Sequence, residues 1–497
     1  MIRSAGVLIP VFSLPSEHGI GTLGQSAFDF IDFLAESGMT YWQMLPTGPT
    51  GFGNSPYQSL SSYAGNPYFI DLDELVKEGL LKEKEITKED WGKNPEKVDY
   101  GAVYKASAHV LKKACDRLPY RHPQDYFEFL EQEGDWVRDY AVFMSIKNER
   151  NGASWQTWPE ELRNHDSREV QEEAEKLKDE VCFYERVQYL YWKQMKKLRA
   201  YARERGIQII GDLPFYAAED SIDVWANPEQ FDLDENYRMT YVSGFPDGQK
   251  WGNPLFNWDR QRQDGYDWWI RRAQHTLESC DVLRIDHFQG YQKYYAVPAE
   301  GKAEDGEWRQ GPGLELFHKL EERVGQRQII VEDLGQLTDE FRQMIRESGY
   351  PGMRILEYAF DPNDPGSLYM PFQYEKNTVV YTGTHDNNTL IGWKNDPDQK
   401  ARVERATEYL GLNKEEGFTW GMLRGAWSSV SDLAIVQMQD LLEVGEEGRM
   451  NNPAGGKDPW TWRCTKKDLN AHLAQKIKEK MLLYCRYNWN AKVSEKD

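Results

Sequence analysis

The sequence predicts an α/β protein built on a (β/α)8 TIM barrel, with a large, mostly helical insertion and loop insertions around the catalytic face. Eight short apolar runs occur along the 497 residues, and their Ile and Val content is typical of parallel strands buried on both faces. Amphipathic helical patterns separate several of these runs. Four of the runs end in carboxylates, and functional groups of this fold lie at the C-terminal ends of its strands.

The expected strands follow one another along the whole chain. They cover residues 6–11, 41–45, 209–212, 282–286, 329–333, 353–357, 379–386 and 433–437. Expected helices at 27–37, 313–324 and 338–347 stop close to Gly38, Gly325 and Gly349, as helix C-terminal signals predict.

Two stretches between the expected strands are too long for simple crossovers. Residues 73–188, between the second and third strands, are charged and helix-like, so we expect a helical insertion there. Residues 215–258, between the third and fourth strands, are rich in Pro, Gly, Asn and aromatic residues, which predicts a loop insertion over the barrel mouth. We expect both insertions to belong to one catalytic domain spanning residues 1–497.

Composition narrows the class of protein and its partners. A formal net charge of −21 disfavours nucleic acid and anionic membrane surfaces, so a neutral ligand fits better. No apolar run reaches the length of a membrane span, and the first residues lack a charged and then apolar leader. Five scattered cysteines without a C-x-x-C pair suit a reducing compartment. We therefore expect a cytoplasmic protein.

Cofactor and metal motifs are weak. Gly19-Ile20-Gly21-Thr22-Leu23-Gly24 has the form of a dinucleotide fingerprint, but the acidic residue expected after the next strand is missing. None of the nine histidines forms an H-x-H or H-E-x-x-H pair. We therefore expect a glycine-rich turn at residues 19–24, no cofactor and no metal.

The carboxylates at the strand ends indicate the chemistry. Arg284 lies two residues before Asp286 on the same strand face and could keep that carboxylate ionised, as a nucleophile requires. Glu332 comes from the next strand, and a carboxyl group beside a carboxylate has a raised pKa and can serve as a general acid. Two carboxyl groups with separate roles are what glycosidic bond chemistry requires. The 18 Trp, 28 Tyr and 20 Phe residues also favour a sugar ligand.

Several motifs resemble those of the 4-α-glucanotransferases, also called amylomaltases or disproportionating enzymes, of the α-amylase clan. Four match the clan's signature regions: Asp212-Leu213-Pro214, Leu283-Arg284-Ile285-Asp286-His287-Phe288, Val331-Glu332-Asp333-Leu334-Gly335 and Thr384-His385-Asp386-Asn387. Four more are specific to the family: Ser55-Pro56-Tyr57-Gln58, Ala64-Gly65-Asn66-Pro67-Tyr68, Trp251-Gly252-Asn253-Pro254 and Arg449-Met450-Asn451.

The resemblance implies roles for individual residues. Asp286 would be the nucleophile, Glu332 the general acid/base, and Asp386 the residue that holds the donor sugar and stabilises the transition state. The same resemblance implies a group of substrate-binding residues: Ser55, Tyr57, Asp212, Trp251, Arg284, His385 and Asn451. It also implies no metal and no organic cofactor.

The implied activity is a retaining transfer of α-1,4-glucan segments between chains of maltooligosaccharides, starch or glycogen. Two alternatives stay open: an α-1,4-glucan hydrolase, in which water replaces the sugar acceptor, and a glucan-binding barrel without activity. The loop at residues 242–250 is shorter than the family's usual loop before Trp-Gly-Asn-Pro, so acceptor preference and product size stay open as well.

Overall fold

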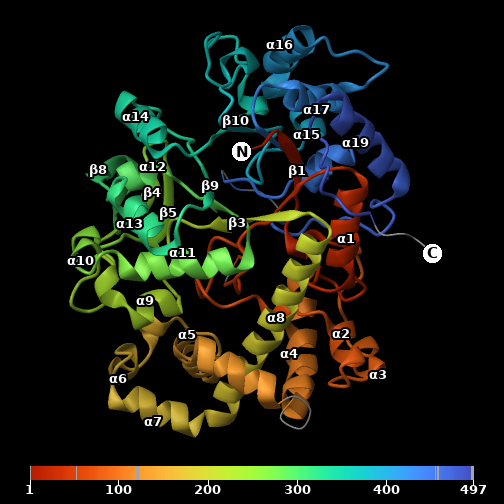
Figure 1. Ribbon diagram of the computed structural model, residues 1–497. Coiled ribbons are helices and arrows are strands. Elements are labelled where there is room, and N and C mark those ends of the chain that lie inside the picture. The colour runs from red at the N-terminus through yellow and green to blue at the C-terminus, as the bar shows by residue number, and fades with distance from the viewer. Residues whose placement is uncertain (1, 52, 119–122, 454, 456–457, 494–497) are drawn as a thin grey trace.

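Eight parallel strands close into a barrel at the centre of the molecule (Figure 1). The structure is a computed structural model that describes residues 2–51, 53–118, 123–453, 455 and 458–493. Around the barrel the strand order is β1-β12-β11-β10-β9-β6-β3-β2. Each expected run overlaps one of these strands, which confirms the fold: β1 (Ser4–Leu8), β2 (Tyr41–Gln43), β3 (Gln208–Leu213), β6 (Val282–Ile285), β9 (Gln328–Val331), β10 (Gly352–Ile355), β11 (Thr378–Tyr381) and β12 (Leu433–Gln437).

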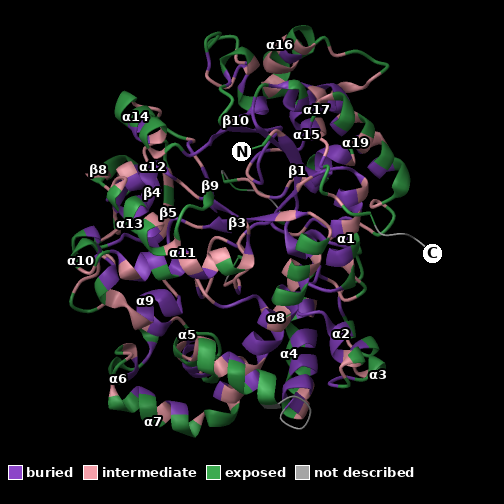
Figure 2. Ribbon diagram, in the orientation of Figure 1, coloured by how far each residue is buried: buried purple, intermediate pink, exposed green. Residues whose placement is uncertain are grey.

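The barrel strands are covered on both faces. Every residue of β1, β11 and β12 is buried, whereas helices such as α7 (Arg168–Lys176) and α14 (Asp339–Ser348) keep an exposed outer side (Figure 2). Side chains fill the barrel interior and helices cover its outside. This two-sided burial explains why the strands are continuous apolar runs without polar alternation.

Helices fill the connections between strands. The three expected helices correspond to α1 (Gln25–Glu36), α13 (Glu315–Val324) and α14. The glycines just after them, Gly38, Gly325 and Gly349, have φ values of +68°, +73° and +68°, a region that favours glycine. The remaining helices of the barrel region are α10 (Trp258–Gln263), α11 (Asp267–Ser279), α12 (Gln289–Gln292), α15 (Leu390–Asn395), α16 (Lys400–Leu410), α17 (Phe418–Ser428), α18 (Met438–Leu441) and α19 (Ala471–Leu483).

The chain between β2 and β3 forms a group of helices that lies beside the barrel (Figure 1). The longest two, α5 and α8, pack against each other, and α8 leads directly into β3. Asp71 begins the group by accepting a hydrogen bond from the amide of Glu74. The helices are α2 (Leu72–Lys77), α3 (Glu83–Thr87), α4 (Tyr100–Arg117), α5 (Pro123–Glu149), α6 (Glu160–Arg163), α7 and α8 (Lys178–Glu204).

The segment 215–258 differs from the expected loop insertion. It contains α9 (Ile222–Ala226) and two strands, β4 (Tyr241–Phe245) and β5 (Gln249–Pro254). These strands join β7 (Lys293–Pro298) and β8 (Glu307–Gln310) in an antiparallel sheet of order β5-β4-β7-β8. The segment therefore holds strands as well as loops, and half of their sheet comes from residues beyond the fourth barrel strand.

Over the part of the chain that the structure describes, none of the helices combines the length and the apolar character that crossing a membrane requires.

Candidate active site

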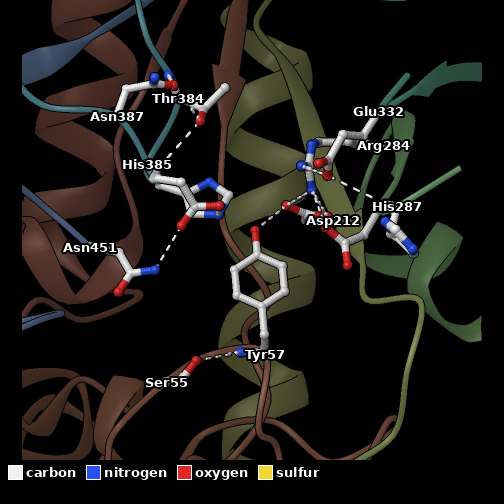
Figure 3. Close-up of polar contacts among 12 residues, drawn as sticks. Ser55, Tyr57, Asp212, Arg284, His287, Glu332, Thr384, His385, Asn387 and Asn451 are labelled. Atoms are coloured by element: carbon white, nitrogen blue, oxygen red, sulfur yellow. Dashed lines mark hydrogen bonds and ion pairs between the residues drawn. The ribbon is translucent and has the colours of Figure 1, made fainter. Parts of the chain in front are cut away.

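One buried guanidinium group joins three carboxylates at the C-terminal end of the barrel. Arg284 lies on β6 directly opposite Asp212 on β3 in the strand register, so both side chains share one face. Nη1 of Arg284 donates to both oxygens of Asp212 at 2.6 Å and to Oδ1 of Asp286 at 3.3 Å. Nη2 donates to Oε2 of Glu332 at 2.5 Å (Figure 3). Arg284 therefore fixes the side chains of Asp286 and Glu332 relative to each other.

Backbone hydrogen bonds place the two carboxylates just beyond their strands. The amide of Asp286 donates to the carbonyl of Leu213, and the amide of Glu332 donates to the carbonyl of Ile285, which continues the barrel ladder past β6 and β9. In addition, the amide of Phe215 donates to Oδ2 of Asp286 at 3.2 Å. Asp286 thus accepts one hydrogen bond on each carboxylate oxygen, and its orientation is set before any ligand binds.

His287 follows Asp286 in a strained backbone conformation. Its φ of +44° is uncommon for a residue with a side chain, and its amide donates to Oε2 of Glu332 at 3.3 Å. Burial lowers the pKa of His287 to about 4, although the charge of Asp286 opposes this shift. The imidazole of His287 is therefore neutral near pH 7. Sequence reasoning placed His287 in a motif but gave it no role, since backbone strain has no signal in the sequence.

Glu332 has the raised pKa that the sequence predicts for the general acid. Burial raises the pKa of Glu332 well above its usual range, and the charges of Asp286 and Asp386 raise it further, while Arg284 opposes them. The direction agrees with the expectation, but burial contributes more than the neighbouring carboxylates. Glu332 can therefore hold a proton at a pH where an exposed glutamate is ionised.

Asp386 is held in its ionised form by polar neighbours. Its Oδ1 accepts from Nδ2 of Asn451 at 2.7 Å, and its Oδ2 lies 3.3 Å from Nε2 of His385 (Figure 3). Burial alone would raise the pKa of Asp386, but the charge and hydrogen bond of His385 and the hydrogen bond of Asn451 outweigh it and lower the pKa to about 2. Arg449 donates to the backbone carbonyls of Asp386 and Asn451 and joins their two segments. The sequence motif contained Arg449 but did not show this contact.

Tyr57 links the two sides of the site. Its hydroxyl group donates to Oδ2 of Asp212 at 2.7 Å, and its ring stacks on His385 with centroids 5.0 Å apart (Figure 3). The hydroxyl group of Ser55 accepts from the amide of Tyr57 and shapes the turn that presents this ring. The side chain of Ser55 thus makes its hydrogen bond within its own turn and not with another part of the site.

Trp251 brings the additional sheet to the edge of the site. It lies on β5, and its ring meets the ring of His287 edge to face with centroids 5.1 Å apart. Its ring also stacks with Phe245 of β4 at 6.3 Å, and its indole NH donates to Gln249. The β4–β5 hairpin therefore places an aromatic cluster against His287, the residue that follows Asp286.

Comparison with known proteins agrees with this geometry. The sequence profile of the 4-alpha-glucanotransferase family matches residues 9–469. The 4-alpha-glucanotransferase of Clostridium butyricum is 41% identical over 484 residues, which cover 96% of this chain and 99% of that protein. That of Thermus thermophilus is 40% identical over 94% of this chain and 96% of its own length.

A solved structure gives the same result. The amylomaltase from Streptococcus agalactiae, determined in complex with acarbose, superposes with a TM-score of 0.94 at 38% identity, over 98% of this chain and 100% of that one. The amylomaltase from Corynebacterium glutamicum has the same fold, with a TM-score of 0.75 at 19% identity. The chain belongs to the 4-alpha-glucanotransferase family.

Proposed function

We propose that this protein transfers α-1,4-glucan segments from one maltooligosaccharide, starch or glycogen chain to another, with retention of configuration. Asp286 is the nucleophile and Glu332 is the general acid/base. Asp386 binds the hydroxyl groups of the donor sugar and stabilises the transition state. Ser55, Tyr57, Asp212, Trp251, Arg284, His385 and Asn451 form the surrounding glucan-binding site.

In the first step, an oxygen of Asp286 attacks the anomeric carbon of the donor while Glu332 gives its proton to the departing glycosidic oxygen. The C–O bond to the leaving glucan breaks, and an ester bond to Asp286 forms. Because its pKa is raised, the carboxyl group of Glu332 holds a proton and can supply it. Arg284 donates a hydrogen bond to Oδ1 of Asp286, which orients this carboxylate for the attack.

In the second step, Glu332, now ionised, takes the proton from the 4-hydroxyl group of an acceptor glucan. The acceptor oxygen attacks the anomeric carbon, the ester bond breaks, and Asp286 returns as a carboxylate. Two inversions restore the α configuration. Water in place of the acceptor would give hydrolysis, so the balance between the two depends on how well the cleft holds a sugar.

The observation that carries this proposal is the shared contact of Arg284. One guanidinium group holds the proposed nucleophile and the proposed acid/base side by side, while the pKa of Glu332 is raised. Two carboxyl groups held side by side with separate roles, one as nucleophile and one as general acid, are the requirement for retaining glycosyl transfer.

Maltotriose tests the proposal directly. We expect chromatography of the products to show glucose together with glucans longer than the substrate, because one maltotriose donates to another. Shortening without any longer product would indicate a hydrolase, and an unchanged substrate would indicate a binding protein without activity. Either of these results would refute the proposed transferase activity.

The proposed partners and location follow from the same reasoning. The ligands are neutral α-1,4-glucans, and the net charge of −21 disfavours nucleic acid. A cytoplasmic location stays a prediction, which fractionation of the native host followed by immunodetection would check.

A further inference from the structure

A second polar cluster lies in a pocket between α5 and α11, away from the carboxylates of the barrel mouth. The pocket has a volume of about 440 Å³, and neither Asp286 nor Glu332 lines it. Glu133 of α5 meets His275 and Glu278 of α11 there. One nitrogen or oxygen atom from each of these three residues lies within 4.8 Å of the other two.

The imidazole of His275 is fixed in one orientation. It is only 7% exposed, and its Nε2 donates to the backbone carbonyl of Tyr63 at 2.8 Å. The rings of Tyr63, Trp136 and Trp192 surround it with centroids 4.9, 5.1 and 4.7 Å away. Because a carbonyl can only accept, Nε2 carries the proton, and the lone pair of the neutral ring is on Nδ1.

This lone pair faces two carboxylates. Nδ1 of His275 lies 3.7 Å from Oε2 of Glu278, too far for a hydrogen bond, and no donor among the described residues reaches it. His275 and Glu278 are three residues apart on α11, so they share a helix face. The indole NH of Trp136 donates to Oε2 of Glu133 at 2.8 Å and leaves the other oxygen free. Three acceptor atoms thus lie within 4.8 Å of one another.

We propose that this cluster binds a divalent transition-metal ion of the Zn²⁺ type. Nδ1 of His275 and one oxygen each from Glu133 and Glu278 are its protein ligands, and water from the pocket completes the coordination. A mixture of imidazole nitrogen and carboxylate oxygen suits Zn²⁺ and Co²⁺ better than Mg²⁺ or Ca²⁺, which prefer oxygen alone.

The contacts around the cluster resemble those that support metal ligands. The hydrogen bond from Nε2 of His275 to a backbone carbonyl and the hydrogen bond from Trp136 to Glu133 each orient one ligand. Zinc bonds of about 2.0–2.1 Å require the ligand atoms to approach to roughly 3.4 Å. The side chain of Glu278 is 56% exposed and can make this movement by rotation.

The bound ion would act as a structural link. It would tie α5 of the helical insertion to α11 of the barrel. Through the carbonyl of Tyr63 it would also steady the segment that follows Tyr57, which contacts Asp212 in the candidate active site. A gain in thermal stability is therefore expected when the ion binds.

Untagged protein, freed of metal by dialysis against a chelator, tests the site. Titration with Co²⁺ should give visible absorption bands that saturate at one equivalent per chain, and calorimetry with Zn²⁺ should give the same stoichiometry. The substitutions Glu133→Gln and Glu278→Gln each remove one ligand charge while preserving shape, so binding should weaken about tenfold or more. Zn²⁺ should raise the melting temperature of the unsubstituted protein more than that of the Glu278→Gln variant at the same Zn²⁺ concentration.

Glu131→Gln is the matched control, because Glu131 is an exposed carboxylate that lines the same pocket outside the cluster. This variant should bind Co²⁺ as the unsubstituted protein does. Absence of saturable Co²⁺ bands would overturn the proposal. Equal affinity in all three variants, or displacement of Co²⁺ by millimolar Ca²⁺, would overturn it as well.

Discussion

Glu332 must be protonated in the first step of transfer, so its ionisation should set the upper pH limit of activity. Burial, Asp286 and Asp386 raise its pKa, and a raised pKa keeps the acid form to higher pH. We expect kcat/KM for maltotriose to fall only above this raised pKa. A profile of kcat/KM between pH 4 and 10 checks the limit. A decline that begins at the pKa of free glutamate, about 4.3, would contradict the assignment.

At the residue scale, the sequence predicted the positions of the carboxylates and one of their contacts with Arg284, but not the others. Strand-end positions placed Asp286 and Glu332 correctly at one end of the barrel, because parallel strands share a direction. The contact of Arg284 with Asp286 was also expected. Its contacts with Asp212 and Glu332 depend on rotamers and on neighbouring strands. The amide of Phe215 carries no sequence signal, since every residue other than proline has one.

At the scale of elements, α11 supports the loop that orients the nucleophile. Arg272, only 1% exposed, donates to the carbonyls of Pro214, Phe215 and Tyr216 at 2.6, 3.1 and 3.3 Å. Replacing it with Met leaves these carbonyls without their donor. We expect Arg272→Met to lower the free energy of unfolding by about 3 kcal/mol and to reduce kcat, because the amide of Phe215 binds Asp286.

Denaturant unfolding measures this effect, with Arg271→Met as the control. Arg271 neighbours Arg272 on α11, but its side chain is 56% exposed and pairs with Asp267, so its loss should cost less than about 0.5 kcal/mol. Similar losses in both variants would show that Arg272 does not hold the loop.

The additional sheet marks the limit of prediction at this scale. The β4 and β5 strands lie among Pro, Gly and Asn residues, and β8 is exposed or half-buried at every position. None of these three strands therefore forms an apolar run in the sequence. β4 and β8 each pair with β7, which comes some fifty residues later in the chain than β4, and β5 pairs with β4. The barrel strands, by contrast, are apolar runs in their own right, and all eight could be predicted.

At the scale of the whole molecule, barrel closure brings distant residues to one site. Asp212 lies on β3, Asp286 and Glu332 follow the neighbouring strands β6 and β9, and Asp386 follows β11 two places further around the barrel. Although 174 positions separate Asp212 from Asp386 in the numbering, Tyr57 touches Asp212 and stacks on His385, the residue before Asp386. The cluster of Glu133 with His275 and Glu278 was not foreseen, because Glu133 comes from the insertion and the rest from α11.

The central claim is that Asp286 forms a covalent glycosyl-enzyme with help from Glu332. The most direct measurement uses an α-glucosyl fluoride, whose leaving group needs little protonation, with the Glu332→Gln and Asp286→Asn variants. We expect Glu332→Gln to react with the fluoride and to carry one sugar on the Asp286 peptide in mass spectrometry, because deglycosylation lacks its base. Asp286→Asn should release no fluoride and carry no sugar. Reaction of both variants or of neither, or a sugar on another peptide, would contradict the assignment of the nucleophile and the acid.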